Sequence, residues 1–179
     1  MGPIHDLLAA DHQRLGALLD AGAWEEFRAG LLRHIAIEEK VLLAEAKRIR
    51  GGAPLPAAAQ LRLDHGAIAT MLAAAPAPWV LTELRALLDA HNVIEEGEGG
   101  VYAACERLAG ESLSDLHARV LAVPPVRLAP VIDPERIRGE IARAVRAAWA
   151  ARGVTRTVDE GCAEPRASRS CRKDPSPGC

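Results

Sequence analysis

The chain has 179 residues and a formal net charge of −2, which fits one ordinary domain with an appendage and is short for two full domains. Apolar residues make up 49% of the chain and charged residues 26%, whereas aromatic residues make up only 3%, a composition typical of a globular, mainly helical protein. The charge excludes a basic chain of the nucleic-acid-binding type, and no apolar run reaches the roughly 20 residues that a membrane span needs.

Residues 1–112 are predicted to form an all-α domain, an up-down four-helix bundle. The expected helices cover residues 3–22, 23–50, 57–76 and 78–110. Pro3 suits the first turn of a helix, and Gly51 and Gly52 suit the end of the second helix. The short connections between helices of this length imply antiparallel neighbours, and hence a bundle.

The rest of the chain divides into three predicted parts. Residues 113–133 form a Pro-rich linker, residues 134–153 an amphipathic helix, and residues 154–179 a disordered tail. The helix has an apolar face that suits packing on the parent bundle or a homodimer with a second copy of itself. The tail holds three of the four cysteines, and their spacing matches no zinc or redox motif. These cysteines are Cys162, Cys171 and Cys179.

An internal repeat of about 55 residues relates the two halves of the bundle. In each half, an Asp-His pair precedes a His-x-x-x-Glu-Glu string. The residues are Asp11, His12, His34, Glu38 and Glu39 in the first half, and Asp64, His65, His91, Glu95 and Glu96 in the second. Because positions i and i+4 share a helical face, each His-x-x-x-Glu string presents a nitrogen and a carboxylate to one point. Each helix is therefore expected to direct one histidine at the core.

Two carboxylates among leucines need a compensating positive charge. No lysine or arginine occupies the inward positions at that level, whereas a metal cation would supply the charge, and four imidazoles with two carboxylates suit iron. The carboxylates can each bridge two ions, so the pattern predicts a dinuclear site. For a single histidine, a buried ring satisfied by a nearby glutamate would be the better interpretation. His5 and His117 fall outside the pattern and are expected at the surface.

Over residues 3–110 these motifs together resemble the hemerythrin-like proteins, the HHE cation-binding domain family. The Glu-x-x-His order of ferritin-like bundles is absent, as is the His-Glu-x-x-His string of zinc proteases. The resemblance implies an up-down four-helix bundle with two non-haem iron ions, with the second-helix and fourth-helix glutamates bridging. The ligands that it implies are His12, His34, Glu38, His65, His91 and Glu95.

Two features depart from the family pattern. Ala69 lies one turn after His65, where oxygen-carrying members have a histidine, so one iron is expected to keep an open or water-filled position. Residues 97–100 read Gly-Glu-Gly-Gly before the single tyrosine, Tyr102, as though two residues were inserted. We expect a local bulge there with Glu98 facing inward, which leaves Glu95 and Glu98 as alternative ligands. Tyr102 lies near the metals or packs in the core.

The residues favour a cytoplasmic diiron protein that binds dioxygen or a related small oxidant, with no membrane partner and no basic leader. They do not separate binding, sensing and storage from catalysis by a diiron oxidase or peroxidase-like enzyme. A second hypothesis is a scaffold or regulatory protein that acts through the helix over residues 134–153. The arginines of that helix are opposed by Glu135 and Glu140, so nucleic acid is not an expected partner.

Overall fold

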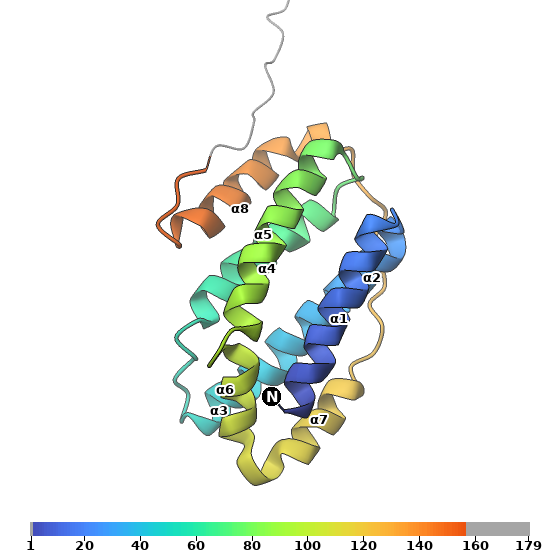
Figure 1. Ribbon diagram of the computed structural model, residues 1–179. Coiled ribbons are helices and arrows are strands. Elements are labelled where there is room, and N and C mark those ends of the chain that lie inside the picture. Colours follow the sequence, from blue (N-terminus) through green and yellow to red (C-terminus); the bar gives the residue numbers. More distant parts are fainter. Residues whose placement is uncertain (1, 157–179) are drawn as a thin grey trace, which may run out of the picture.

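A computed structural model describes residues 2–156, and this part of the chain is helical almost throughout (Figure 1). In chain order the elements are α1 (Pro3–Asp20), α2 (Trp24–Ile37), the π-helical turn η1 (Glu38–Leu42), α3 (Leu43–Ile49), α4 (Ala58–Leu72), α5 (Pro78–Glu96), α6 (Val101–Ala109), the 3-10 turn η2 (Gly110–Ser112), α7 (Leu113–Leu121), the 3-10 turn η3 (Pro134–Ile137) and α8 (Arg138–Ala150). The predicted all-α class is confirmed for these residues. None of the helices described has the length and apolarity to cross a membrane. The predicted tail and its cysteines lie outside the described residues from position 157 onward.

The N-terminus of α1 is fixed to α6. It begins at Pro3, as predicted, and has no side-chain cap from its own sequence. Instead the carboxylate of Glu106, on α6, accepts hydrogen bonds from the backbone N–H groups of Gly2, Ile4 and His5, at 3.1, 2.7 and 3.0 Å. A carboxylate at a helix N-terminus satisfies exposed N–H groups and complements the helix dipole. Glu106 therefore holds α1 and α6 together.

The second segment runs without a break from α2 through η1 to α3, close to the predicted 23–50. At Glu38–Leu42 the helix widens into a π-helical turn, which the sequence did not indicate. Such turns insert a residue into the helical register and occur often at functional sites. The turn begins at Glu38, one of the predicted ligands. The direction of the Glu38 side chain is therefore set by an irregular part of the helix.

The predicted fourth helix is divided in two, which corrects both its boundaries and the bulge. α5 ends at Glu96 and α6 begins at Val101, while Glu98 is exposed on the intervening loop and does not face inward. Glycine is required in this loop, because a Cβ at Gly100 would lie 2.5 Å from the backbone oxygen of residue 95 and Gly99 has a φ of +70°. The loop restarts the helix in a new phase, which places Tyr102 in the core.

The predicted linker over residues 113–133 is also corrected, because its first part is the helix α7. Leu116 and Val120 of α7 are buried, which explains why these residues fold. The remainder runs beside α2, where Arg33 donates to the oxygen of Val123 at 2.9 Å and Arg28 to that of Ala129 at 3.1 Å. It then reaches the end of α4, where the backbone N–H of Ile132 donates to the oxygen of Ala73 at 2.9 Å. This stretch then leads into η3 and α8.

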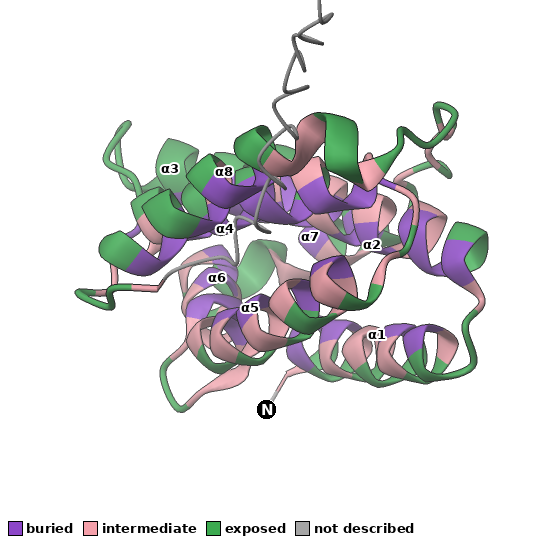
Figure 2. Cartoon of the chain, turned by 90° about the horizontal axis from the view of Figure 1, so that it is seen from above, coloured by how far each residue is buried: buried purple, intermediate pink, exposed green. Residues whose placement is uncertain are grey.

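The buried side chains form two apolar clusters with a polar layer between them. Along α1, Leu8 belongs to one cluster and Leu15 to the other, with His12 between them. α2, α4 and α5 likewise carry a histidine between residues of the two clusters. Figure 2 shows the buried side of each helix turned toward its neighbours and the exposed side turned outward. The apolar clusters therefore enclose the histidine layer from both sides.

The C-terminal helix α8 packs on α4 within the same chain. Its apolar face is covered completely, because Ile141, Val145 and Ala148 are 0% exposed. The predicted amphipathic helix over 134–153 is thus present as η3 and α8, and the face that suggested a homodimer is buried inside the chain.

Candidate metal centre

Six buried or nearly buried side chains from four helical segments converge in the polar layer. They form two groups in which one ligand atom per residue lies within 4.8 Å of the others. The first group is His12, His34, Glu38 and Glu95, and the second is Glu38, His65, His91 and Glu95. All six predicted ligands are therefore brought together. The open choice between Glu95 and Glu98 resolves to Glu95, because Glu95 is 0% exposed and belongs to both groups.

Each shared carboxylate offers one oxygen to each group. The Oε1 of Glu38 lies 3.1 Å from the Nε2 of His34, and its Oε2 lies 3.2 Å from the Nε2 of His65. Glu95 is arranged in the same way: its Oε2 lies 3.5 Å from the Nε2 of the α1 histidine, and its Oε1 lies 3.1 Å from that of the α5 histidine. Two carboxylates with their oxygens divided in this manner suit a pair of bridged cations.

A second set of carboxylates orients the four imidazole rings. Each histidine Nδ1 lies within hydrogen-bonding distance of a carboxylate on another helix. The pairs are His12 with Glu96 at 2.5 Å, His34 with Asp11 at 2.9 Å, His65 with Glu39 at 2.8 Å, and His91 with Asp64 at 3.2 Å. A ring whose Nδ1–H donates to a carboxylate keeps its Nε2 directed inward and becomes a more basic ligand. These acids are visible in the sequence repeat, but their role depends on helix packing that the repeat does not contain.

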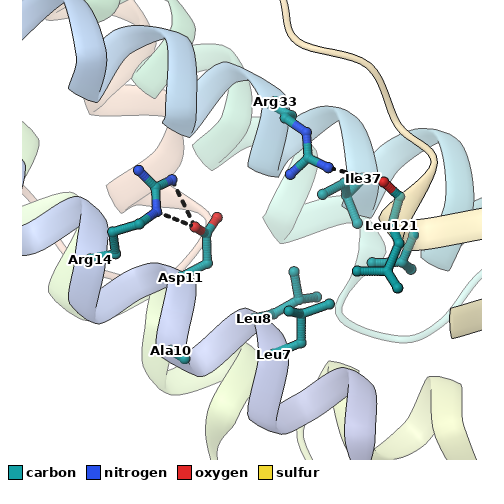
Figure 3. Close-up of a pocket in the computed structure, with 9 residues that line it drawn as sticks. Leu7, Leu8, Ala10, Asp11, Arg14, Arg33, Ile37 and Leu121 are labelled. Carbon is teal, nitrogen blue, oxygen red and sulfur yellow. Dashed lines mark hydrogen bonds and ion pairs between the residues drawn. The ribbon is translucent and has the colours of Figure 1, made fainter. Parts of the chain in front are cut away.

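Asp11, the outer carboxylate of the first half, is also partly exposed at the surface. Figure 3 shows it paired with Arg14, with Nε–Oδ1 at 2.8 Å, beside an open cavity of about 260 Å³ that Leu7, Leu8 and Ile37 help to line. Burial raises the pKa of Asp11, but hydrogen bonds from His34 and Arg14 outweigh this effect and hold the pKa below its usual value. Asp11 is therefore ionised when it accepts the proton of the ring.

The outer carboxylate of the second half, Asp64, depends on the C-terminal helix. Arg152, just after α8, bonds both Asp64 oxygens, with each of the two N–O distances at 2.5 Å. The amide of Gln60 donates to Oδ1 at 2.8 Å. Asp64 is 0% exposed, so its charge has to be compensated within the fold, and His91 and Arg152 share this role. α8 thus supports the ring of His91 through Asp64, a link that the sequence analysis missed.

The charges of the inner carboxylates are balanced by histidine protons when no cation is bound. Burial lowers the pKa of His34, but the charge of Glu38 and the hydrogen bonds that the ring donates to Asp11 and Glu38 outweigh it and raise the pKa to about 10. The pKa of His91 is likewise raised to about 10, chiefly by Glu95 acting against burial. Burial and the neighbouring charge of Glu38 raise the pKa of Glu95 to about 7. The site therefore attracts positive charge.

The second group contains buried atoms that a cation would satisfy. Among the described residues, the Oε2 of Glu38, the Nε2 of His65 and the Oε1 of Glu95 are buried and make no hydrogen bond of good geometry, although each lies 3.1–3.2 Å from an oppositely charged group or its partner ring. An unsatisfied buried polar group costs about 1–3 kcal/mol, and all three of these atoms face the same point. Nitrogen and oxygen donors in this ratio fit a divalent transition metal, so the residues present are suited to hold one.

The only tyrosine of the chain lies in the first group. The hydroxyl oxygen of Tyr102 is 3.1 Å from the Nε2 of His34 and 3.3 Å from that of His12. It also lies 2.5 Å from the Oε1 of Glu38 and 3.0 Å from the Oε2 of Glu95. Of the two predicted places for Tyr102, near the metals or packed in the core, both are found: the side chain is fully buried and its hydroxyl lies among the candidate ligands.

Two predictions about neighbouring residues are wrong. His5 is buried rather than at the surface, and its ring lies edge-on to Tyr102 with centroids 6.2 Å apart. Ala69 is exposed and does not face the polar layer, because the phase of α4 turns Ile68 inward instead. An alanine gap beside the metal is therefore not present at this position. His117, also expected at the surface, is half-buried on α7.

Comparison with known proteins finds no match: no protein-family model, no curated protein and no solved structure matches this chain. The resemblance of the motifs to the hemerythrin-like family stays a prediction, and the geometry of the site is the basis for the function proposed below.

Proposed function

We propose that the chain is a dinuclear non-haem iron protein of the hemerythrin-like kind, an up-down four-helix bundle that binds dioxygen or a related small oxidant. One observation carries the proposal: two fully buried carboxylates, Glu38 and Glu95, each give one oxygen to each of two histidine pairs. A single ion would need only one group of two histidines and two carboxylate oxygens. Two groups that share both carboxylates suit a pair of neighbouring ions.

The choice of iron rests on the chemistry of the donors. Imidazole and carboxylate ligands suit iron, whereas a structural zinc site is usually a closed tetrahedron rich in thiolates. When bound, two ferrous ions would supply the electrons that reduce a small oxidant. The protein's part is to hold the four rings through Asp11, Glu39, Asp64 and Glu96, and to exclude water with the apolar clusters on either side.

A narrow cleft supports a small ligand rather than a large one. It is lined by residues of α1, α2 and α5, has a volume of about 100 Å³, and has His12 among its lining residues. Leu15, Leu31 and Leu88 are among its lining residues. The lining also includes the polar residues Arg85, Asp89 and Asn92. A cleft of this volume has room for a diatomic molecule or peroxide and is too small for a bulky organic substrate. Gly16 at its edge has open space where a Cβ would lie.

The function is tested with iron-loaded protein that is reduced without air and then mixed with oxygenated buffer. We expect oxygen consumption together with a change in the visible spectrum. His34→Ala should abolish both, whereas His117→Ala, which alters a histidine outside the two groups, should leave both unchanged. A wild-type protein that holds two ferrous ions and yet shows no oxygen uptake and no spectral change would contradict the proposal.

The rival interpretations gain no comparable observation. An interaction protein acting through the apolar face of its C-terminal helix would need that face exposed, and Ile141 and Val145 are fully buried against the chain itself. The possible homodimer through the C-terminal helix stays a prediction. Oxidase or peroxidase activity at the same centre also stays a prediction, and its test is product analysis after the oxygen reaction.

A further inference from the structure

The two halves of the candidate centre are unequal, and Tyr102 makes them so. Its hydroxyl lies 2.5–3.3 Å from all four inward atoms of the His12 and His34 group. In the His65 and His91 group no hydroxyl takes this place among the described residues, and three of the inward atoms make no hydrogen bond of good geometry. In the first group the tyrosine hydroxyl satisfies the inward atoms. In the second group no hydroxyl of residues 2–156 does so, and a cation would be needed to satisfy them.

Several contacts hold Tyr102 close to this position. Its side chain is 0% exposed and packs in an apolar cluster with the ring of His5 edge-on to it. Its helix, α6, is fixed to α1 through Glu106, whose carboxylate accepts hydrogen bonds from three backbone N–H groups of α1 and the residue before it. A ring buried in this way can retreat only slightly when a cation enters between the histidines. The hydroxyl oxygen would then remain beside the ion.

We propose that Tyr102 is a ligand of the cation held by His12 and His34, and that the cation held by His65 and His91 has no corresponding ligand. This inference rests on the proposed function, because it requires a metal in the first group. On binding, the phenolic O–H bond is replaced by an oxygen–metal bond, and the proton is released to solvent without any transfer of electrons. A bound cation favours such deprotonation of an oxygen ligand, as it does for water.

The inequality has a consequence for the two ions. The first ion would have five protein atoms as ligands, namely two nitrogens, two carboxylate oxygens and a phenolate oxygen. The second would have four, two nitrogens and two carboxylate oxygens. The extra anionic oxygen favours the ferric state of the first ion, so the two ions are expected to differ in reduction potential and in colour.

The test uses the full chain, loaded with iron in air, with metal content and resonance Raman spectra recorded on the same sample. Because the chain contains a single tyrosine, any tyrosinate vibration enhanced by a visible charge-transfer band must come from Tyr102. We expect such a band in the wild type. Tyr102→Phe should lose it while far-UV circular dichroism stays unchanged, and His5→Phe, which alters the neighbouring ring, should keep it.

The outcomes separate this inference from the function on which it rests. Two irons per chain with tyrosinate vibrations support both. Two irons per chain without any tyrosinate vibration overturn the role of Tyr102 and leave the dinuclear centre standing. A chain that binds no iron overturns the proposed function itself. If Tyr102→Phe fails to fold, the wild-type spectrum still decides, since it needs no variant for its assignment.

Discussion

Removal of the Arg152 side chain should destabilise the protein and weaken the second half of the centre. Arg152 bonds both oxygens of Asp64, which is fully buried and accepts from His91. The arginine side chain itself is only 13% exposed, so solvent screens this pair little. Arg152→Ala leaves a buried carboxylate that keeps only His91 and the amide of Gln60 as partners.

The magnitude follows from the burial of the pair. Removing one partner of a buried ion pair costs about 3–5 kcal/mol when the other charge is left without compensation. Asp64 retains two hydrogen bonds, so the lower limit of about 3 kcal/mol applies to Arg152→Ala. Arg152→Lys keeps the charge but loses the two-pronged geometry, and an intermediate loss is expected.

Urea denaturation of the metal-free protein measures this loss. Arg143→Ala is the matched control, because Arg143 lies exposed on α8, where substitutions change stability by about 0.5 kcal/mol or less. A double-mutant cycle with Asp64→Asn isolates the pair. An Arg152→Ala variant as stable as Arg143→Ala would show that Asp64 does not depend on the C-terminal helix.

Three further results are expected. The pKa values of His34 and His91 are raised from 6.5 to about 10 in the folded chain. The stability that these protonated rings contribute is therefore complete below pH 6.5 and is lost as the pH rises toward 10. Urea unfolding of metal-free protein should show this fall, and a flat or rising profile would contradict it. Gly16→Leu should slow the reaction of the reduced protein with oxygen in stopped-flow measurements, because the side chain fills open space at the cleft, whereas Gly139→Leu on α8 should not; equal rates would exclude the cleft as the route. Asp11→Asn should weaken metal binding about 10–100-fold in competition with a chelator, because the acceptor of the His34 Nδ1–H loses its negative charge, and an unchanged affinity would refute the orienting role.

The six inner residues could be predicted because their signal is local. A His-x-x-x-Glu string places both side chains on one helical face whatever the surrounding fold. The repeat of that string in the second half, each time after an Asp-His pair, indicated that four such faces converge. Helix periodicity and turn residues likewise predicted α1, α4 and the span from α2 to α3 closely.

The remaining features depend on contacts between residues far apart in the sequence. Helical periodicity cannot predict such contacts. Arg152 and Asp64 are 88 positions apart, and Glu106 caps a helix 102 positions before it. The exposure of Ala69 depends on the rotation of α4, which its neighbours fix rather than its own sequence. The glycine loop after Glu96 indicated an irregularity, but whether it bulged or ended the helix depended on where Tyr102 could be buried.

The outer carboxylates show how a pattern can be visible without its meaning. Asp11 and Asp64 precede the α1 and α4 histidines, yet each binds the ring of a different helix, His34 or His91. Sequence neighbours suggested a local pair, and only the packing of the helices brings the acid to its partner. A repeated acid beside a repeated ligand is a signal that can be sought in other chains.

The central claim is that two cation sites share Glu38 and Glu95, and ferrous titration without air tests it most directly. Bound iron is counted after gel filtration of the wild type, of the double variant Glu38→Gln with Glu95→Gln, and of Glu26→Gln as an exposed control. The account predicts two ions per chain in the wild type and the control, with both lost in the double variant. One ion per chain in the wild type, or two retained in the double variant, would contradict it.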